Sequence, residues 1–162
     1  MSGRGTPPGT IVKCGCHCSP EVSHSPSPDD RRFSDDFASG RIEPAAFDHR
    51  AHIRLAYTLL AEHDTETALA LMRGALQAFI RRNNVPVAKY HETLTRAWIL
   101  AVHHFMAISP AAASAAEFVA GNPRMLDAKI MLTHYSAEVL FSPEARARFI
   151  EPDLEKIPRH DG

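Results

Sequence analysis

Apolar residues recur three and four positions apart along most of the chain from Phe37 onward. This spacing places apolar side chains on one face of an α-helix, and neither an alternating strand pattern nor an internal repeat interrupts it. Proline, glycine and N-cap residues divide the pattern into separate helices. We expect helices over about 44–62, 65–82 and 88–108, and shorter segments over about 110–120, 123–132 and 143–150.

Residues 1–35 follow a different pattern, with many glycine, proline and serine residues and few apolar ones. Such a composition buries too little apolar surface to offset the entropy lost on ordering, so it predicts a disordered leader. We therefore expect this leader, a helical domain over residues 36–158 and a tail over residues 159–162. The domain is predicted to be an all-α, compact bundle of five to six helices, mostly antiparallel, because short loops connect them.

The cysteines of the chain lie in the leader, in the motif Cys14-Gly-Cys16-His17-Cys18. An odd, closely spaced set of cysteines is a poor disulfide framework. The thiolates and His17 are suited to copper or zinc, whereas a reduced, exposed tail without a function explains the same motif. The sequence leaves both interpretations open.

The length, charge and apolar content of the chain argue against two classes of binding partner, nucleic acids and membranes. The chain has 162 residues and a formal net charge of −1, so no global electrostatic attraction to nucleic acid or anionic membranes is expected. No apolar run approaches the roughly 20 residues that span a bilayer, and residues 1–10 lack the apolar core of a signal peptide. We therefore expect a cytoplasmic protein with no nucleic-acid or membrane partner. The histidine pocket described next makes a small molecule the expected ligand.

Histidines occur at the predicted starts of two helices: His49 and His52 in one, His91 in the other. Short connections favour antiparallel neighbours, so both helix starts should lie at the same end of the bundle. At 1.5 Å rise per residue, His49 and His91 lie roughly 5–6 Å into their helices. His52 shares a face with His49, because residues three apart are neighbours on a helix surface. We therefore expect the three imidazoles to converge.

Convergent imidazoles permit a metal centre. A helix N-terminus disfavours the imidazolium, and the neutral imidazole is the form that binds a metal or accepts a proton. In this first hypothesis, His49, His52 and His91 hold one divalent ion of zinc, iron or manganese. Glu92 or water completes the coordination shell, and a metal-bound water acts as the nucleophile or base on a small substrate.

The same pocket also permits chemistry without a metal. His91 and Glu92 then act as an acid–base pair, with Glu92 as the catalytic carboxylate. Thr95, Tyr135 and Arg146 are the candidate ligand contacts, with Tyr135 or Arg146 orienting a carboxylated or phosphorylated molecule. Two further interpretations stay open: the histidines are hydrogen-bonded core residues, or the domain is a helical interaction module. The sequence does not decide whether the protein is an enzyme.

Four segments of the helical domain together resemble a family of small bacterial all-helical proteins. They are Phe47-Asp-His-Arg-Ala-His52, Tyr90-His-Glu-Thr-Leu-Thr-Arg-Ala-Trp98, His134-Tyr-Ser-Ala-Glu-Val-Leu140 and Ser142-Pro-Glu-Ala-Arg-Ala-Arg-Phe-Ile-Glu-Pro-Asp-Leu154. The resemblance covers about Phe47–Pro158 and implies a helical fold, but the family has no settled function, so it does not choose among the hypotheses. A three-histidine pocket is also similar to helical-bundle metalloenzymes of the DinB type, although their second His-x-x-x-His pair is absent here.

Overall fold

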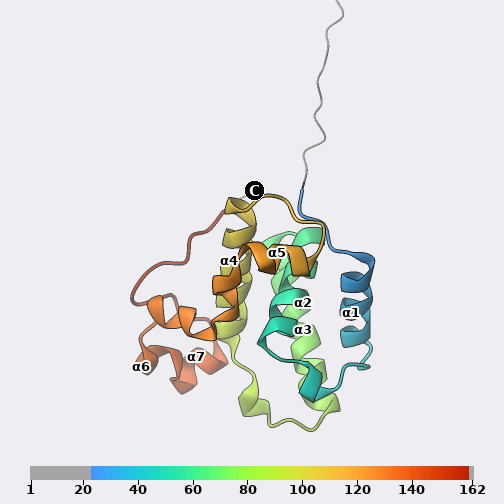
Figure 1. Cartoon of the computed structure of the whole chain (residues 1–162). Coiled ribbons are helices and arrows are strands. Elements are labelled where there is room, and N and C mark those ends of the chain that lie inside the picture. Colours follow the sequence, from blue (N-terminus) through green and yellow to red (C-terminus); the bar gives the residue numbers. More distant parts are fainter. Residues whose placement is uncertain (1–22, 161–162) are drawn as a thin grey trace, which may run out of the picture.

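The computed structural model describes residues 23–160, and all regular secondary structure within them is helical, as the apolar spacing predicted. Helices α2 (His49–Glu62), α3 (Thr65–Arg82) and α4 (Glu92–Ile108) form the centre, and each packs against the other two. Helix α1 (Pro28–Ala38) covers α2 and α3 on one side of the molecule (Figure 1). The short helices α5 (Ala115–Gly121), α6 (Ala137–Leu140) and α7 (Pro143–Ala147) complete the bundle, with α6 and α7 on the side opposite α1.

Each central helix begins at a residue whose side chain accepts a hydrogen bond from a backbone N–H of the first turn. Asp48 caps α2, Asp64 caps α3 and His91 caps α4. The helix starts predicted near residues 44 and 88 are therefore too early. Pro44–Ala46 and Val87–Lys89 instead form separate 3-10 turns, η1 and η2, that lead into α2 and α4.

The chain after α4 is less regular than the sequence predicted. Ser109 is the C-cap residue of α4, and its hydroxyl donates to Asn122 Oδ1 at 3.0 Å. The helix predicted over about 110–120 therefore begins later, after Ser114, as α5. The segment predicted to be helical over about 123–132 forms two 3-10 turns, η3 (Pro123–Leu126) and η4 (Ala128–Thr133).

Helix α1 lies partly inside the segment predicted to be disordered, so the boundary at residue 35 is wrong. Ser27 and Asp30 form a capping box at its start, each side chain accepting from the other's backbone N–H. Phe37, 1% exposed, stacks on Phe47 and Phe79 with ring centroids 4.4 and 5.1 Å apart. The composition of residues 1–35 does not reveal this helix, because contacts with segments distant in the sequence stabilise it. The cysteine motif lies outside the described residues.

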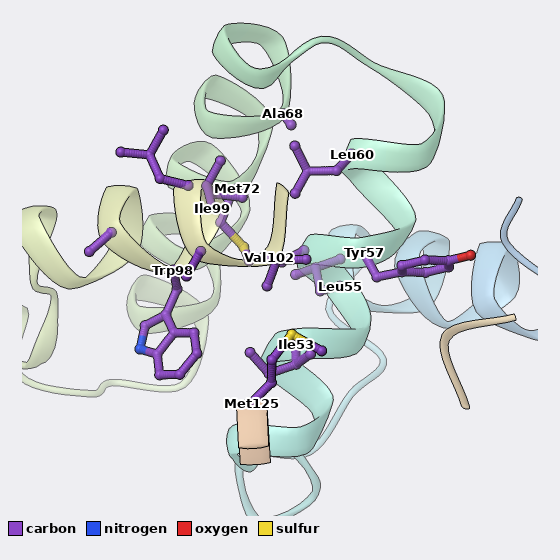
Figure 2. Close-up of a cluster of buried hydrophobic side chains, with 14 of the residues drawn as sticks. Ile53, Leu55, Tyr57, Leu60, Ala68, Met72, Trp98, Ile99, Val102 and Met125 are labelled. Carbon is purple, nitrogen blue, oxygen red and sulfur yellow. The ribbon is translucent and has the colours of Figure 1, made fainter. Parts of the chain in front are cut away.

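The three central helices and η3 bury their apolar side chains in one continuous core. Tyr57 of α2 is fully buried there, and its hydroxyl donates to the Ala112 carbonyl at 2.9 Å. No helix within residues 23–160 is long and apolar enough to cross a membrane. Figure 2 shows the centre of the core, with Ile53, Leu55, Tyr57, Leu60, Ala68, Met72, Trp98, Ile99, Val102 and Met125 labelled.

Candidate functional site

A cavity of about 550 Å³ lies where α2 and α4 begin and α3 ends. His49, His52 and His91 all line it, so the structure brings the three histidines singled out by sequence to one cavity. The rest of the wall is mostly apolar and comes from α3, α4, η4 and α6, and from residues in or next to η1 and η2. Its aromatic side chains are Phe47, Phe79, Tyr90, Trp98 and Phe141.

His91 uses both ring nitrogens inside the protein. Its Nδ1 accepts from the Leu94 backbone N–H at 3.1 Å, so the ring proton lies on Nε2, which donates to the Leu140 carbonyl at 2.7 Å. The side chain is 7% exposed, and burial lowers its pKa. His91 is therefore a neutral helix cap that joins α4 to α6. Neither nitrogen is available to a metal ion or a substrate in this arrangement.

His49 is committed at one ring nitrogen. Its Nε2 donates to the Met125 carbonyl at 2.8 Å, which ties the first turn of α2 to η3. The ring also packs edge-on against Trp98, with the centroids 4.7 Å apart. These contacts fix the imidazole in the cavity wall and leave only Nδ1 without a partner.

His52 differs from the other two histidines because its side chain makes no hydrogen bond with any described residue. Its ring lies against Phe47, with centroids 5.2 Å apart, in the cavity wall. Burial, and to a lesser extent the neighbouring His49, lowers the pKa of His52 to about 4. At pH 7 its ring is neutral, so it presents one hydrogen-bond donor and one acceptor to a molecule in the cavity.

The low pKa of His52 makes the stability of the fold depend on pH. Unfolded histidine titrates near 6.5, so the unfolded chain takes up this proton first as the pH falls. The free energy of unfolding should fall between pH 6.5 and 4, by at most about 1.4 kcal/mol per pH unit from this group. Urea unfolding at pH 7 and pH 5 should show a smaller loss in His52→Gln than in the wild type.

The matched control is His63→Gln, which removes an exposed histidine at the end of α2. This variant keeps His52, so its loss of stability between pH 7 and pH 5 should be larger than that of His52→Gln. Equal losses in His52→Gln and the wild type would mean that His52 titrates like a solvent-exposed histidine.

Glu92 points away from the cavity, contrary to the proposed acid–base pairing with His91. Arg73 Nε lies 3.0 Å from each carboxylate oxygen, and the Tyr90 hydroxyl donates to the same carboxylate. Burial alone would raise the pKa of Glu92, but the hydrogen bonds from Arg73 and Tyr90 outweigh it and lower the pKa. The pairing is wrong for this structure because consecutive residues at a helix start face different directions.

The predicted ligand contacts are divided between three places. Thr95 lines the cavity, and its hydroxyl donates to the His91 carbonyl at 2.8 Å. Tyr135 is fully buried away from the cavity, where its hydroxyl donates to the Ile150 carbonyl. Arg146 is exposed in a separate surface depression beside Glu92 and donates to a backbone carbonyl. Of the three, only Thr95 is placed to meet a molecule in the cavity.

A second group of histidines lies towards the opposite end of α4. His104 Nδ1 and His160 Nε2 are 2.7 Å apart, and their rings stack with centroids 5.0 Å apart. His103 packs edge-on against the same His160 ring. This pair attaches His160, the last described residue, to α4.

Sequence reasoning missed Lys89 and Lys129, which line the cavity from η2 and η4. Trp98 is a further residue of the cavity wall that the sequence did not single out; it belongs to the core as well. The only feature of the sequence that pointed to Lys89 and Lys129 is the scarcity of lysine. The whole chain contains four lysines, and two of them line this cavity.

The donor set for a metal ion is not assembled in the part of the chain that the structure describes. Within residues 23–160, no three histidine, cysteine, aspartate or glutamate side chains are grouped so that they could hold one ion. The family resemblance of the sequence motifs stays a prediction. No protein-family model, curated protein or solved structure matches this chain.

Proposed function

We propose that this protein binds an apolar small molecule in the cavity at the starts of α2 and α4, without a metal ion. A cavity of about 550 Å³ is within the range of small-molecule pockets, which are typically apolar with a few polar groups. The observation that carries the proposal is His52, a neutral imidazole in a mostly apolar wall, whose ring nitrogens have no hydrogen-bond partner among residues 23–160.

The geometry supports binding rather than acid–base catalysis. Both nitrogens of His91 are used within the fold, and Glu92 is paired with Arg73 outside the cavity. A ligand that covers His52 removes water from its ring, which costs about 1–3 kcal/mol unless the ligand replaces the lost hydrogen bonds. The bound molecule therefore has a largely apolar body and at least one polar group that reaches His52.

A direct test uses N-phenyl-1-naphthylamine, a neutral apolar fluorophore whose emission rises in apolar surroundings. Trp98 is the only tryptophan of the chain and lines the cavity, so energy transfer from Trp98 to the probe reports occupancy of this site. We expect saturable binding that is unchanged by a metal chelator. Absence of saturable binding would contradict the proposal. Chelator-sensitive binding, restored by zinc, would favour the metal centre on His49, His52 and His91 instead.

Filling the cavity should weaken probe binding. Ala128 lies on η4 at the exposed edge of the cavity, so Ala128→Phe places a ring in the opening. We expect the dissociation constant of the probe to rise by about tenfold or more, equivalent to about 1.4 kcal/mol. The matched control, Ala120→Phe, adds the same ring at an exposed position of α5 outside the cavity and should leave the constant unchanged.

A further inference from the structure

We infer that the ligand of this cavity is an amphipathic anion, an apolar acid whose charged group lies at the opening between Lys89 and Lys129. The inference rests on the proposed function and specifies the chemical class of the ligand. It follows from three features of the cavity: its charged side chains are all cationic, its walls are apolar, and its exposed edge carries large apolar side chains.

The charge at the cavity is one-sided. Lys89 and Lys129 line it, and no aspartate or glutamate is among the described residues that do so. Both lysines are exposed, and neither forms a salt bridge with a carboxylate of residues 23–160. They come from two separate turns, η2 and η4, so the fold itself brings the two charges to one opening.

This local charge contrasts with the protein as a whole. The chain carries 18 lysine and arginine residues against 19 aspartate and glutamate residues, and the salt bridges of the structure involve arginines. Two unpaired ammonium groups beside low-dielectric walls concentrate positive potential at the opening. An anion gains from this potential, whereas a cation is repelled by it.

The edge of the cavity also offers exposed apolar surface to a ligand. Phe141 and Leu132 line the cavity and are 55% and 41% exposed, which is high for large apolar side chains. A ligand with an apolar body covers these side chains, while the flexible stems of Lys89 and Lys129 keep their ammonium groups in contact with its charged end. The apolar edge and the cationic opening together fit an alkyl or aryl acid better than an uncharged apolar molecule or a free inorganic anion.

Two matched probes separate the charge preference from apolar binding. 8-Anilinonaphthalene-1-sulfonate has the same ring system as N-phenyl-1-naphthylamine and adds one sulfonate. We expect the wild type to bind the sulfonate probe more tightly than the neutral one. In the double variant Lys89→Gln/Lys129→Gln this preference should fall by about tenfold, with the affinity for the neutral probe changed by less than about twofold. Added salt should weaken only the binding of the sulfonate probe.

Lys156→Gln is the matched control, because Lys156 is exposed and lies outside this cavity. It should leave the preference for the sulfonate probe unchanged.

Competition against the neutral probe then tests the class of ligand. The competitors are dodecanoate, dodecyl phosphate, dodecanol and dodecylamine, each below its micelle concentration. The two anions should displace the probe at lower concentrations than the alcohol and the amine, and their order distinguishes a carboxylate from a phosphate.

The outcomes separate this inference from the proposed function. If the neutral probe binds but the double variant keeps the full preference, or dodecylamine competes as well as dodecanoate, the anion inference is overturned and the proposed function stands. If neither probe binds saturably, both are overturned.

Discussion

Asp30→Ala is expected to lower the free energy of unfolding by about 3–5 kcal/mol, the largest effect that the structure predicts for a single substitution. The Asp30 side chain is 3% exposed and accepts from the backbone N–H groups of Ser27 at 3.0 Å and Ala115 at 2.8 Å. It also accepts from Arg54 Nε at 2.8 Å. One carboxylate thus joins α1, α2 and α5. Its removal leaves buried N–H groups without an acceptor and the Arg54 guanidinium without its carboxylate. Urea unfolding followed by circular dichroism measures the loss.

Asp29→Ala is the matched control, because the neighbouring carboxylate pairs only with Arg32 and both side chains are more than 70% exposed. Exposed pairs of this kind contribute about 0–1 kcal/mol, so this variant should be close to the wild type. A loss below about 1 kcal/mol in Asp30→Ala would show that the three helices are held together without this carboxylate.

The pH dependence of Asp30 checks the same assignment. Burial alone raises the pKa of this carboxyl, but the hydrogen bonds from Ala115, Ser27 and Arg54 outweigh it and lower the pKa. The contribution of Asp30 to stability is therefore present above the unfolded pKa of about 3.9 and is lost as the pH falls through the lower folded value. The difference between the wild type and Asp30→Asn should shrink over that acidic range.

Asp30 also shows why the sequence predicted the central helices but not α1. The apolar spacing of α2 and α3 is local, and Asp64 is a strong N-cap signal, so the sequence places the end of α2 and the start of α3 correctly. The partners of Asp30 lie up to 85 residues away along the chain. Composition within residues 1–35 carries no information about Ala115, so a segment fixed by distant contacts resembles a disordered one.

The same distinction applies to the candidate site. Helix periodicity and short loops were sufficient to bring His49, His52 and His91 to one end of the bundle. They could not show which ring nitrogens are already used, because the partners of His49 and His91 are the Met125 and Leu140 carbonyls, 76 and 49 residues away.

The cationic opening was missed for a related reason. Lys129 lies on a segment that the sequence predicted to be an ordinary helix, where an exposed lysine carries no particular meaning. In the structure Lys129 lies on the 3-10 turn η4, whose N-cap residue is Asp127 and which forms one side of the cavity. Whether an exposed lysine contributes to a binding site depends on whether the fold places it beside a cavity, and this cannot be read from the local sequence.

His91→Ala is the second large effect that we expect, a loss of about 2–4 kcal/mol in the free energy of unfolding. The substitution removes the N-cap of α4, which typically contributes about 0.5–2 kcal/mol, and leaves the Leu94 N–H without its acceptor. It also leaves the Leu140 carbonyl without its donor in a site where His91 is 7% exposed. Urea unfolding at pH 7 measures the loss.

Two further variants divide this effect between its causes. His91→Asn retains a side-chain acceptor at the N-cap but is too short to reach Leu140, so it should recover about half of the loss. His63→Ala, at an exposed position, should be nearly neutral. Because Leu140 and Phe141 line the cavity, His91→Asn should also weaken binding of the neutral probe by loosening α6. A loss below about 1 kcal/mol in His91→Ala, together with loss of bound zinc, would instead identify His91 as a ligand of a metal ion and overturn its role as a structural cap.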